Sequence, residues 1–240
     1  CFQLLKRKNM ELVKKLKSKK FKLNDWFMNT ISLPSHFTDL PLVPYFNFIR
    51  AKLKILPGDL LEFGVFRGDS IISTALLLKR LGIKKKIYGF DTFEGFKLKK
   101  HKFDNPKIFK QLYKNKKINK KHYQWIKLRD EAIRNGFIRN HEWKNTSYNF
   151  VKKRIKQFNL QNDIVLIKGD IAKTTKKFIF KNKQFASVFM DCNLYEPHVS
   201  ALNFSWDLLV KGGAIFLDDY FSLKYPGARI AINEFCKNNR

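Results

Sequence analysis

The segment from Ser187 to Tyr220 constrains the fold of this chain most. It reads as an apolar strand that ends at Asp191, an amphipathic helix, a Gly-Gly turn and a second apolar strand that ends at Asp218 and Asp219. Two strands joined by a helix run parallel in one sheet. Because the carboxyl ends of parallel strands lie side by side, we expect the three carboxylates to meet at one edge of the sheet, where a hard cation finds the oxygen ligands it prefers.

The same pattern occurs earlier in the chain. The residues predict a strand over 59–63, a glycine-containing turn, a helix over about 70–81 with Gly82 as its C-cap, and a second strand over 87–90 that ends at Asp91. This order is a βαβ unit, which requires parallel strands and a right-handed crossover. The chain is therefore predicted to be an α/β protein with a mostly parallel, doubly wound sheet and helices on both faces.

The remaining elements follow in the same order. We expect further strands over 164–168, 185–190 and 214–217 and further helices over 148–158, from just after Glu196, and over 228–236. The helix after Glu196 carries Pro197 in its first turn, where proline is favoured. Its spacing by three and four predicts that it packs on the sheet through an apolar face made of Val199, Leu202, Trp206 and Leu209.

Two regions stand apart from this pattern. Residues 1–56 are predicted to be an N-terminal helical segment, with a Lys-rich helix within 1–25, a proline-rich connection over 26–45 and a short helix over 46–56. Residues 57–240 are predicted to be the main domain. Within it, an insertion over about 97–147 shows no strand and is rich in aromatic residues, which predicts short helices that form a lid or a substrate-binding element over the mouth of the site.

The chain is strongly basic, with a formal net charge of +29. Lys is scattered over the whole sequence, and Asn, Ile and Phe are also abundant, which favours a generally solvated basic surface. A real preference for anionic substrates, glycans or nucleic acid is the alternative, and it predicts binding that depends strongly on salt.

The sequence contains no apolar run long enough to span a membrane. The three cysteines, Cys1, Cys192 and Cys236, are spaced too widely for a disulfide framework or a zinc site. This spacing favours a reducing compartment, so a cytoplasmic location is predicted.

The turn between the first strand and its helix contains a second set of candidate ligand-binding residues. Gly64 would let a ligand approach the backbone, and Asp91 at the end of the next strand is placed to accept hydrogen bonds from both hydroxyls of a ribose. The alternative is a tight turn with an aspartate that caps a helix. Two glycines alone are a weak signal, because the turn from Glu62 to Gly68 lacks the spacing of a dinucleotide-binding motif.

Four segments together carry a resemblance to a known family. LLEFGVFRGDS, YGFDTFEGF, MDCNLYEPHVSAL and GGAIFLDDYFSLKYPGARIAINEF resemble the TylF/MycF family of S-adenosylmethionine-dependent O-methyltransferases, which includes macrocin and noviose sugar methyltransferases. The resemblance covers about 56–235 apart from the insertion. It implies a Rossmann-like class I methyltransferase sheet, although the chain stops at Arg240 before the usual final pair of antiparallel strands. Carried over by motif position, it implies a cofactor site made of Glu62, Gly64, Gly68, Ser70, Asp91, Thr92, Asp170 and Ile171.

The resemblance also implies Mg²⁺ on Asp191, Asp218 and Asp219, where the ion would activate a hydroxyl for methylation. Relatives often have a second aspartate, the proposed general base, where this chain has Asn193. An amide does not accept a proton at neutral pH. His198 is the nearest other candidate base. The alternative is that it points to solvent, because it lies one turn into a helix.

The leading hypothesis is therefore a Mg²⁺-dependent and S-adenosylmethionine-dependent O-methyltransferase that acts on a hydroxyl of a sugar or a glycosylated small molecule. Two alternatives stay open. Asn193 and the divergent insertion suggest a catalytically weakened scaffold that binds the cofactor, and the charge of +29 suggests a methyltransferase of nucleic acid or anionic glycan. A homo-oligomer is a further expectation.

Overall fold

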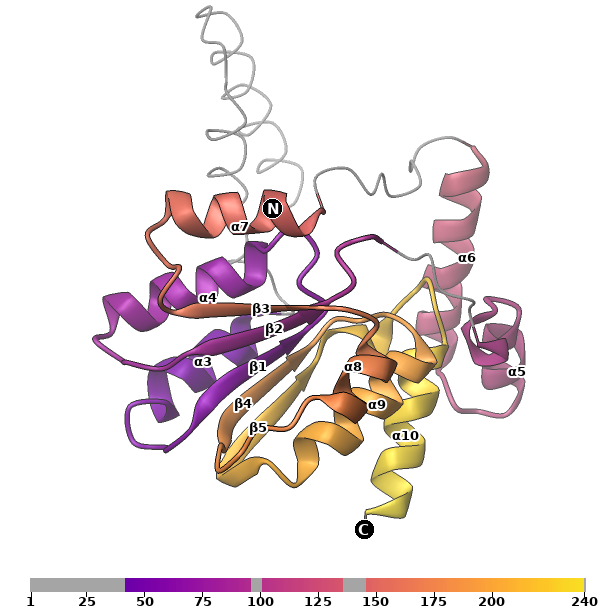
Figure 1. Ribbon diagram of the computed structural model, residues 1–240. Helices are drawn as coiled ribbons and strands as arrows, with labels where there is room; N and C mark the ends of the chain where they lie inside the picture. Colours follow the sequence, from indigo (N-terminus) through magenta and orange to yellow (C-terminus); the bar gives the residue numbers. More distant parts are fainter. Residues whose placement is uncertain (1–41, 96–100, 136–145, 240) are drawn as a thin grey trace, which may run out of the picture. The chain divides into compact units, whose positions relative to one another are not determined.

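A computed structural model describes residues 42–95, 101–135 and 146–239, and Figure 1 shows the chain as a ribbon. Residues 36–240 form one compact unit. The helix expected within 1–25 lies outside the described residues. No described helix combines the length and the apolarity needed to cross a bilayer.

The centre of this unit is a five-stranded sheet of β1 (Asp59–Phe63), β2 (Ile87–Asp91), β3 (Ile164–Lys168), β4 (Phe185–Met190) and β5 (Leu209–Leu217). The strand order is β3-β2-β1-β4-β5, and every neighbouring pair is parallel. The predicted α/β sheet is confirmed, and the described residues contribute no antiparallel pair. From β1 the chain adds β2 and then β3 on one side, and it later adds β4 and β5 on the other side. The strand order therefore reverses between β1 and β4, so a ligand crevice is expected at the carboxyl ends of these two strands.

The start of β5 differs from the prediction. We expected a turn at the two glycines and a strand from Ala214, whereas β5 begins at Leu209 and contains the glycines. Phe185 pairs with Leu209 but Ser187 pairs with Ala214, so β5 carries extra residues as a bulge. Gly212 has a φ of 83°, a conformation that glycine adopts without strain.

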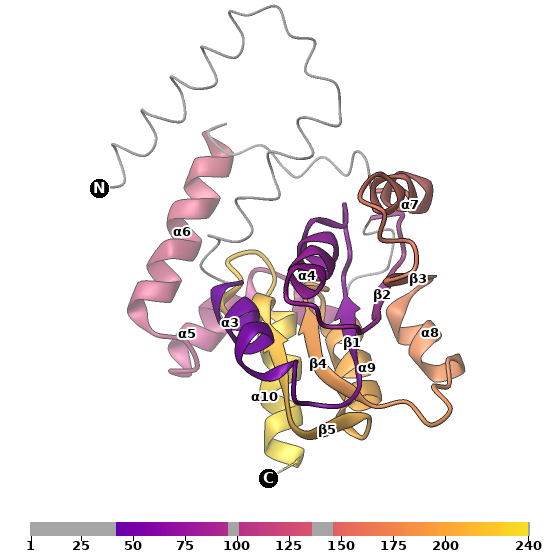
Figure 2. The same cartoon turned by 90° about the vertical axis from the view of Figure 1, so that its left-hand side faces the viewer.

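Helices cover both faces of the sheet (Figure 1; Figure 2). On one face lie α3 (Val43–Lys52), α4 (Asp69–Arg80) and α7 (Tyr148–Gln157), and on the other lie α8 (Ile171–Lys177), α9 (Tyr195–Trp206) and α10 (Gly227–Asn238). Strand residues alternate between the two layers. Phe189 stacks on Tyr45 of α3, whereas its neighbour Met190 belongs to the core cluster that contains Leu202 of α9 and Ile232 of α10.

Helix α3 begins at Val43 instead of Phe46 and ends at Lys52, short of the predicted end at Leu56. The earlier start has a simple reason: Pro44 occupies the first turn of the helix, where its missing N–H costs nothing. Tyr45 and Ile49 are fully buried. This helix therefore packs against the sheet within the compact unit.

The packing face of α9 was predicted only in part, because Leu202 is buried as expected whereas Leu209 belongs to β5. Trp206 is 46% exposed, and the buried residues are Pro197, His198, Ala201, Leu202 and Ser205. Two polar side chains can face the core because each satisfies a backbone carbonyl: the Ser205 hydroxyl donates to Ala201 O, and His198 Nδ1 lies 2.9 Å from Leu194 O.

Within the insertion, the described residues form the 3₁₀ helix η1 (Lys102–Asp104), α5 (Ile108–Lys114) and α6 (Lys120–Arg134). They bury a small core of Phe109, Ile118 and Ile126, against which Leu223 packs. A carboxylate oxygen of Asp104 also accepts a hydrogen bond from the backbone N–H of Tyr195 at 2.8 Å. The insertion is therefore joined to the first turn of α9 and to the loop before α10.

Candidate active site

A cavity of about 310 Å³ opens at the carboxyl ends of the central strands. Its lining comes from the turns after β1, β2, β4 and β5 and from the start of α8, as expected for the point where the strand order reverses. The lining residues are Gly64, Phe66, Asp91, Thr92, Gly95, Ile171, Asp191, Cys192, Asn193, Leu194, Pro197, Asp218, Asp219 and Lys224.

Three carboxylates gather at one side of this cavity. Asp191 directly follows β4, and Asp218 and Asp219 begin the 3₁₀ helix η2 (Asp218–Phe221) directly after β5. One oxygen of each carboxylate lies within 4.8 Å of the others. The pairing of Met190 with Leu217 aligns the two strand ends and so brings these side chains together. Three such oxygens suit a hard divalent cation that keeps water or substrate oxygens in its open positions.

The electrostatics of this cluster favour a positive ion. Desolvation, with the neighbouring carboxylates Asp219 and Asp218, raises the pKa of Asp191 well above its usual range. Desolvation also raises the pKa of Asp219 to about 7, although a hydrogen bond from the Asn193 backbone opposes the rise. Each ionised carboxylate disfavours the next, and a bound divalent cation relieves this repulsion.

Asn193 connects two of the three carboxylates. Its backbone N–H donates to Asp219 Oδ2 at 2.6 Å, and its side-chain Nδ2 donates to Asp191 Oδ1 at 3.2 Å. Its φ of 60° is left-handed, a conformation that asparagine tolerates better than most residues. Asn193 therefore orients the cluster through its donors, and it offers no group that accepts a proton.

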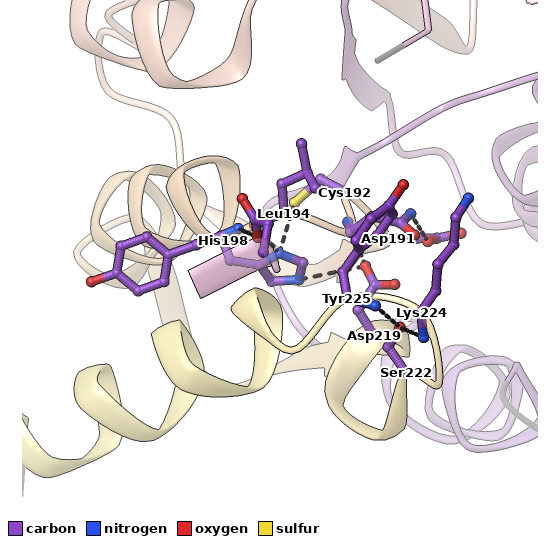
Figure 3. Close-up of polar contacts among 11 residues, drawn as sticks. Asp191, Cys192, Leu194, His198, Asp219, Ser222, Lys224 and Tyr225 are labelled. Carbon is purple, nitrogen blue, oxygen red and sulfur yellow. Dashed lines mark hydrogen bonds and ion pairs between the residues drawn. The ribbon is translucent and has the colours of Figure 1, made fainter. Parts of the chain in front are cut away.

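His198 lies behind the cluster, not in the cavity (Figure 3). It is completely buried, so the expectation that it points to solvent is wrong. Its Nδ1 lies 3.3 Å from Cys192 Sγ, and its Nε2 lies 3.7 Å from Asp219 Oδ2. Desolvation lowers its pKa to about 4. A neutral buried imidazole whose Nδ1–H donates to Leu194 O holds the Asp191–Leu194 loop, and its geometry does not support contact with an acceptor hydroxyl.

Asp91 faces the cavity from the end of β2. Its two carboxylate oxygens accept the backbone N–H groups of Phe66 at 2.9 Å and Phe93 at 2.7 Å, so the turns after β1 and β2 hold the carboxylate in place. Each oxygen has a second lone pair; the Thr92 hydroxyl lies 3.4 Å from Oδ1 but is closer to Gly95 O, at 3.1 Å, and can donate its one proton there instead. The carboxylate can therefore accept two further hydrogen bonds from a vicinal diol such as a ribose.

Gly64 brings the β1 turn against the end of β4. Its φ is 91°, and a Cβ at this position would lie 1.9 Å from Asp191 O. Only glycine permits this approach, which places the floor of the cavity next to the first metal-binding candidate. The candidate cofactor site on the turn after β1 and the candidate metal site at the ends of β4 and β5 are therefore in direct contact.

Glu62 is fully buried beneath the cavity and does not line it. Its Oε1 accepts a hydrogen bond from Ser70 Oγ at 2.6 Å, whereas its Oε2 has no hydrogen-bond partner among the described residues. Desolvation raises its pKa to about 8, although the Ser70 bond opposes the rise. An unsatisfied buried carboxylate oxygen fits the ammonium group of an amino-acid moiety such as that of S-adenosylmethionine.

Glu62→Gln should flatten the pH dependence of stability. Between pH 4.5 and about 8 the carboxyl group is protonated when folded and ionised when unfolded, so the folded protein binds more protons and its stability falls as pH rises through this window. The difference is at most about 5 kcal/mol. Urea denaturation of both proteins at pH 5 and pH 8 measures it, and the comparison cancels the contributions of other carboxylates. Equal pH slopes would refute the assignment.

The other expected cofactor positions lie outside the cavity lining. Gly68 is the N-cap of α4, and Ser70 is engaged with Glu62. Asp170 caps α8 through a hydrogen bond from Ala172 N at 3.0 Å, while its neighbour Ile171 lines the cavity. The sequence reasoning missed several lining residues: Phe66, Gly95, Cys192, Leu194, Pro197 and Lys224. Most of them adjoin predicted site residues, but no pattern in the sequence indicated Lys224.

Solved structures with this fold include methyltransferases. The calicheamicin methyltransferase CalS11 is similar with a TM-score of 0.59 and 20% identity, over 95% of this chain and 83% of that chain. The O-methyltransferase NovP has a TM-score of 0.55 and 17% identity, over 87% of this chain and 72% of that chain. An apo structure of CalS11, described as a TDP-rhamnose 3'-O-methyltransferase, has a TM-score of 0.54 and 18% identity, over 95% and 84%. The expected Rossmann-like class I methyltransferase fold is confirmed.

Sequence comparison extends this result from fold to family. A search among curated protein sequences found no match. A sequence model of the family described as Macrocin-O-methyltransferase (TylF), however, matches residues 49–240. This match spans most of the chain and includes every residue that lines the cavity. The chain therefore belongs to the macrocin-O-methyltransferase (TylF) family of S-adenosylmethionine-dependent O-methyltransferases.

Proposed function

We propose that this enzyme methylates a hydroxyl of a sugar or a glycosylated small molecule, with Mg²⁺ held by Asp191, Asp218 and Asp219. The observation that carries the proposal is the gathering of these carboxylates within 4.8 Å in the cavity that Asp91 also lines. A diol-binding carboxylate and a cation-binding cluster in one cavity suit a nucleoside cofactor beside a hydroxyl acceptor. The sugar substrate named for CalS11 supports the same acceptor class.

The cofactor half of the cavity would be formed by the turns after β1 and β2. Asp91 would hold the ribose hydroxyls, Gly64 would admit the methionine part close to the backbone, and Glu62 would pair with its ammonium group. Ile171 would supply an apolar contact near the adenine. These contacts would orient the cofactor within the cavity, and orientation of this kind supplies much of the rate of a transfer between two bound molecules.

The metal half would hold the acceptor. Asp191, Asp218 and Asp219 would hold Mg²⁺, which would supply the Lewis-acid chemistry that makes an acceptor hydroxyl easier to deprotonate. Asp191 and Asp219 would keep their orientation through the two donors of Asn193, and His198 would hold the loop that carries Asn193 through Leu194 O. Because Asn193 cannot take the hydroxyl proton, the carboxylates and the water around them would have to receive it.

Calorimetric titration with S-adenosylhomocysteine tests the cofactor half. We expect one site per chain, weakened at least about tenfold by Asp91→Ala, which loses the hydrogen bonds to both ribose hydroxyls. A folded protein that shows no binding would refute the proposal. A methyl-transfer assay on glycosylated acceptors with and without Mg²⁺ tests the second half.

Asn193→Asp separates an enzyme from a weakened scaffold. We expect the unaltered protein to turn over and the variant to be faster by about 10²-fold with Mg²⁺, because it regains a positioned base. Without Mg²⁺ the variant should be less stable, since it loses the donor to Asp191 and adds a like charge. An inactive unaltered protein and an active variant would instead support the scaffold alternative.

The net charge of +29 keeps a nucleic-acid or anionic-glycan acceptor as the second candidate function. Filter binding of nucleic acid over a salt series tests it, and absence of binding at low salt removes it. The cytoplasmic location and the homo-oligomer stay predictions.

A further inference from the structure

Asp104 connects the insertion to the loop that carries the candidate metal site. It lies in η1, early in the insertion, and is only 2% exposed. Its Oδ1 accepts a hydrogen bond from the backbone N–H of Tyr195 at 2.8 Å, and its Oδ2 accepts one from the backbone N–H of His101 at 3.0 Å. Both oxygens of this buried carboxylate are therefore used by the protein, and one of the two bonds crosses to α9.

Helix α9 takes its side-chain cap from the insertion. Its own N-cap residue, Leu194, is apolar and makes no side-chain cap hydrogen bond. The first N–H groups of a helix need partners from outside the helix, and a carboxylate placed there also interacts favourably with the helix dipole. Asp104 satisfies the N–H of Tyr195, the first residue of α9, although the two lie 91 positions apart in the chain.

The first residue of α10 leaves room for this bond. Gly227 begins α10, and a Cβ at this position would lie 2.0 Å from Asp104 Oδ1 and 2.9 Å from Tyr195 N. Any other residue there would push the carboxylate away from the N–H that it accepts. The His101 ring also stacks on the Tyr195 ring, with 4.5 Å between the ring centroids. The insertion, α9 and α10 therefore meet at the Asp104 carboxylate.

The peptide group between Leu194 and Tyr195 is held at both of its ends. Asp104 accepts its N–H, and the buried His198 donates from Nδ1 to its carbonyl oxygen, Leu194 O, at 2.9 Å. One contact comes from the insertion and the other from within α9. Together they fix the plane of a peptide group that lies one residue after Asn193.

Asn193 needs this support. Its φ of 60° is left-handed, and a residue keeps such a sparsely populated conformation only where the surrounding structure holds it. In this conformation its backbone N–H donates to Asp219 Oδ2 at 2.6 Å, and its side chain donates to Asp191 Oδ1 at 3.2 Å. If the turn could rotate, both donors would move away from the carboxylates.

We propose that Asp104 is a positioning residue for the candidate metal site, because it fixes the turn from Asn193 to Tyr195. Through the two donors of Asn193, this turn orients Asp191 and Asp219. The insertion thereby takes part in cation binding, although none of its described residues lines the cavity that holds the carboxylates. This inference rests on the proposed function, since it assigns Asp104 a role toward the cation of that site.

Mn²⁺ titrations followed by electron paramagnetic resonance test the inference. Mn²⁺ prefers the same oxygen ligands as Mg²⁺, and the signal of the free ion gives the affinity directly. Asp104→Ala loses both hydrogen bonds and should weaken Mn²⁺ binding at least about tenfold. Asp104→Asn keeps one acceptor oxygen and should weaken it less. Both variants should bind S-adenosylhomocysteine within about twofold of the unaltered protein, which also shows that they are folded.

Two further variants separate positioning from stability. Asn119 caps α6 within the insertion by accepting a hydrogen bond from the His122 N–H at 2.8 Å. Asn119→Ala should therefore lower the Tm, but it should leave the affinity for Mn²⁺ within about twofold. Gly227→Ala keeps the Asp104 carboxylate and pushes it away from Tyr195 N, so it should weaken Mn²⁺ binding as Asp104→Ala does.

The outcomes distinguish this inference from the proposed function. Unchanged Mn²⁺ affinity in Asp104→Ala, or in a folded Asp104→Asn if the Ala variant does not fold, would overturn the inference and leave the proposed function intact. Equal weakening by Asp104→Ala and Asn119→Ala would also overturn it, because the effect would then follow the stability of the insertion alone. Absence of Mn²⁺ binding by the unaltered protein would instead remove the metal site of the proposed function, and the inference with it.

Discussion

Asp191→Asn is expected to lower kcat/KM for methyl transfer by about 10³-fold or more. The substitution preserves the shape of the side chain and removes one of the three negative charges that would hold Mg²⁺. Omission of Mg²⁺ should lower the rate of the unaltered protein to a similar level. Methyl-transfer rates across a Mg²⁺ titration measure both effects.

A binding readout separates loss of the metal from loss of the fold. Mg²⁺ should raise the Tm of the unaltered protein, because a ligand that binds only the folded state stabilises it, and this rise should vanish in Asp191→Asn. Asp207→Asn is the matched control, since Asp207 is exposed at the end of α9 and away from the cavity. Full activity of Asp191→Asn, or an equal loss in the control, would refute the metal site.

Gly64→Ala should have the largest effect on stability. The new Cβ would lie 1.9 Å from Asp191 O and 2.5 Å from Asp191 C, both of them backbone atoms. The β1 turn and the end of β4 must therefore separate, and the left-handed φ of 91° adds strain. We expect a loss of roughly 4 kcal/mol or more in the free energy of unfolding, measured by urea denaturation.

Gly82→Ala provides the control for backbone strain alone. Gly82 also has a positive φ, 66°, but a Cβ there would meet nothing within 4 Å. Its substitution should cost only about 1–2 kcal/mol. Equal losses in the two variants would show that the contact with Asp191 does not matter. If Gly64→Ala fails to fold while Gly82→Ala folds, the result agrees with the expected separation of the β1 turn from the end of β4.

The strands were predictable because each is a short apolar run bounded by polar or turn residues. The bounds of β1, β3 and β4 agree with the prediction, and Asp91, Asp191 and Asp218 follow from the ends of their runs. The start of β5 was missed because glycines that usually mark a turn here form a bulge inside the strand. A local pattern does not distinguish these two uses of glycine.

The packing face of α9 was predicted only in part, for a different reason. The prediction relied on the spacing of apolar residues, and these included Trp206, which is exposed. The buried face instead includes His198 and Ser205, whose polar atoms are satisfied by carbonyls one turn earlier in the same helix. Once the backbone satisfies a polar group, the group costs little in the core, so hydrophobicity alone misplaces the face.

By itself the sequence determined the parallel sheet, the family resemblance and the gathering of Asp191, Asp218 and Asp219, because the direction of parallel strands places their carboxyl ends at one edge. The tertiary structure alone decided how the insertion meets this site. Asp104 joins the start of α9, and Arg129 and Lys224 line one cavity although they are distant in the chain. Such contacts depend on how separate surfaces pack, and no periodicity along the chain encodes that.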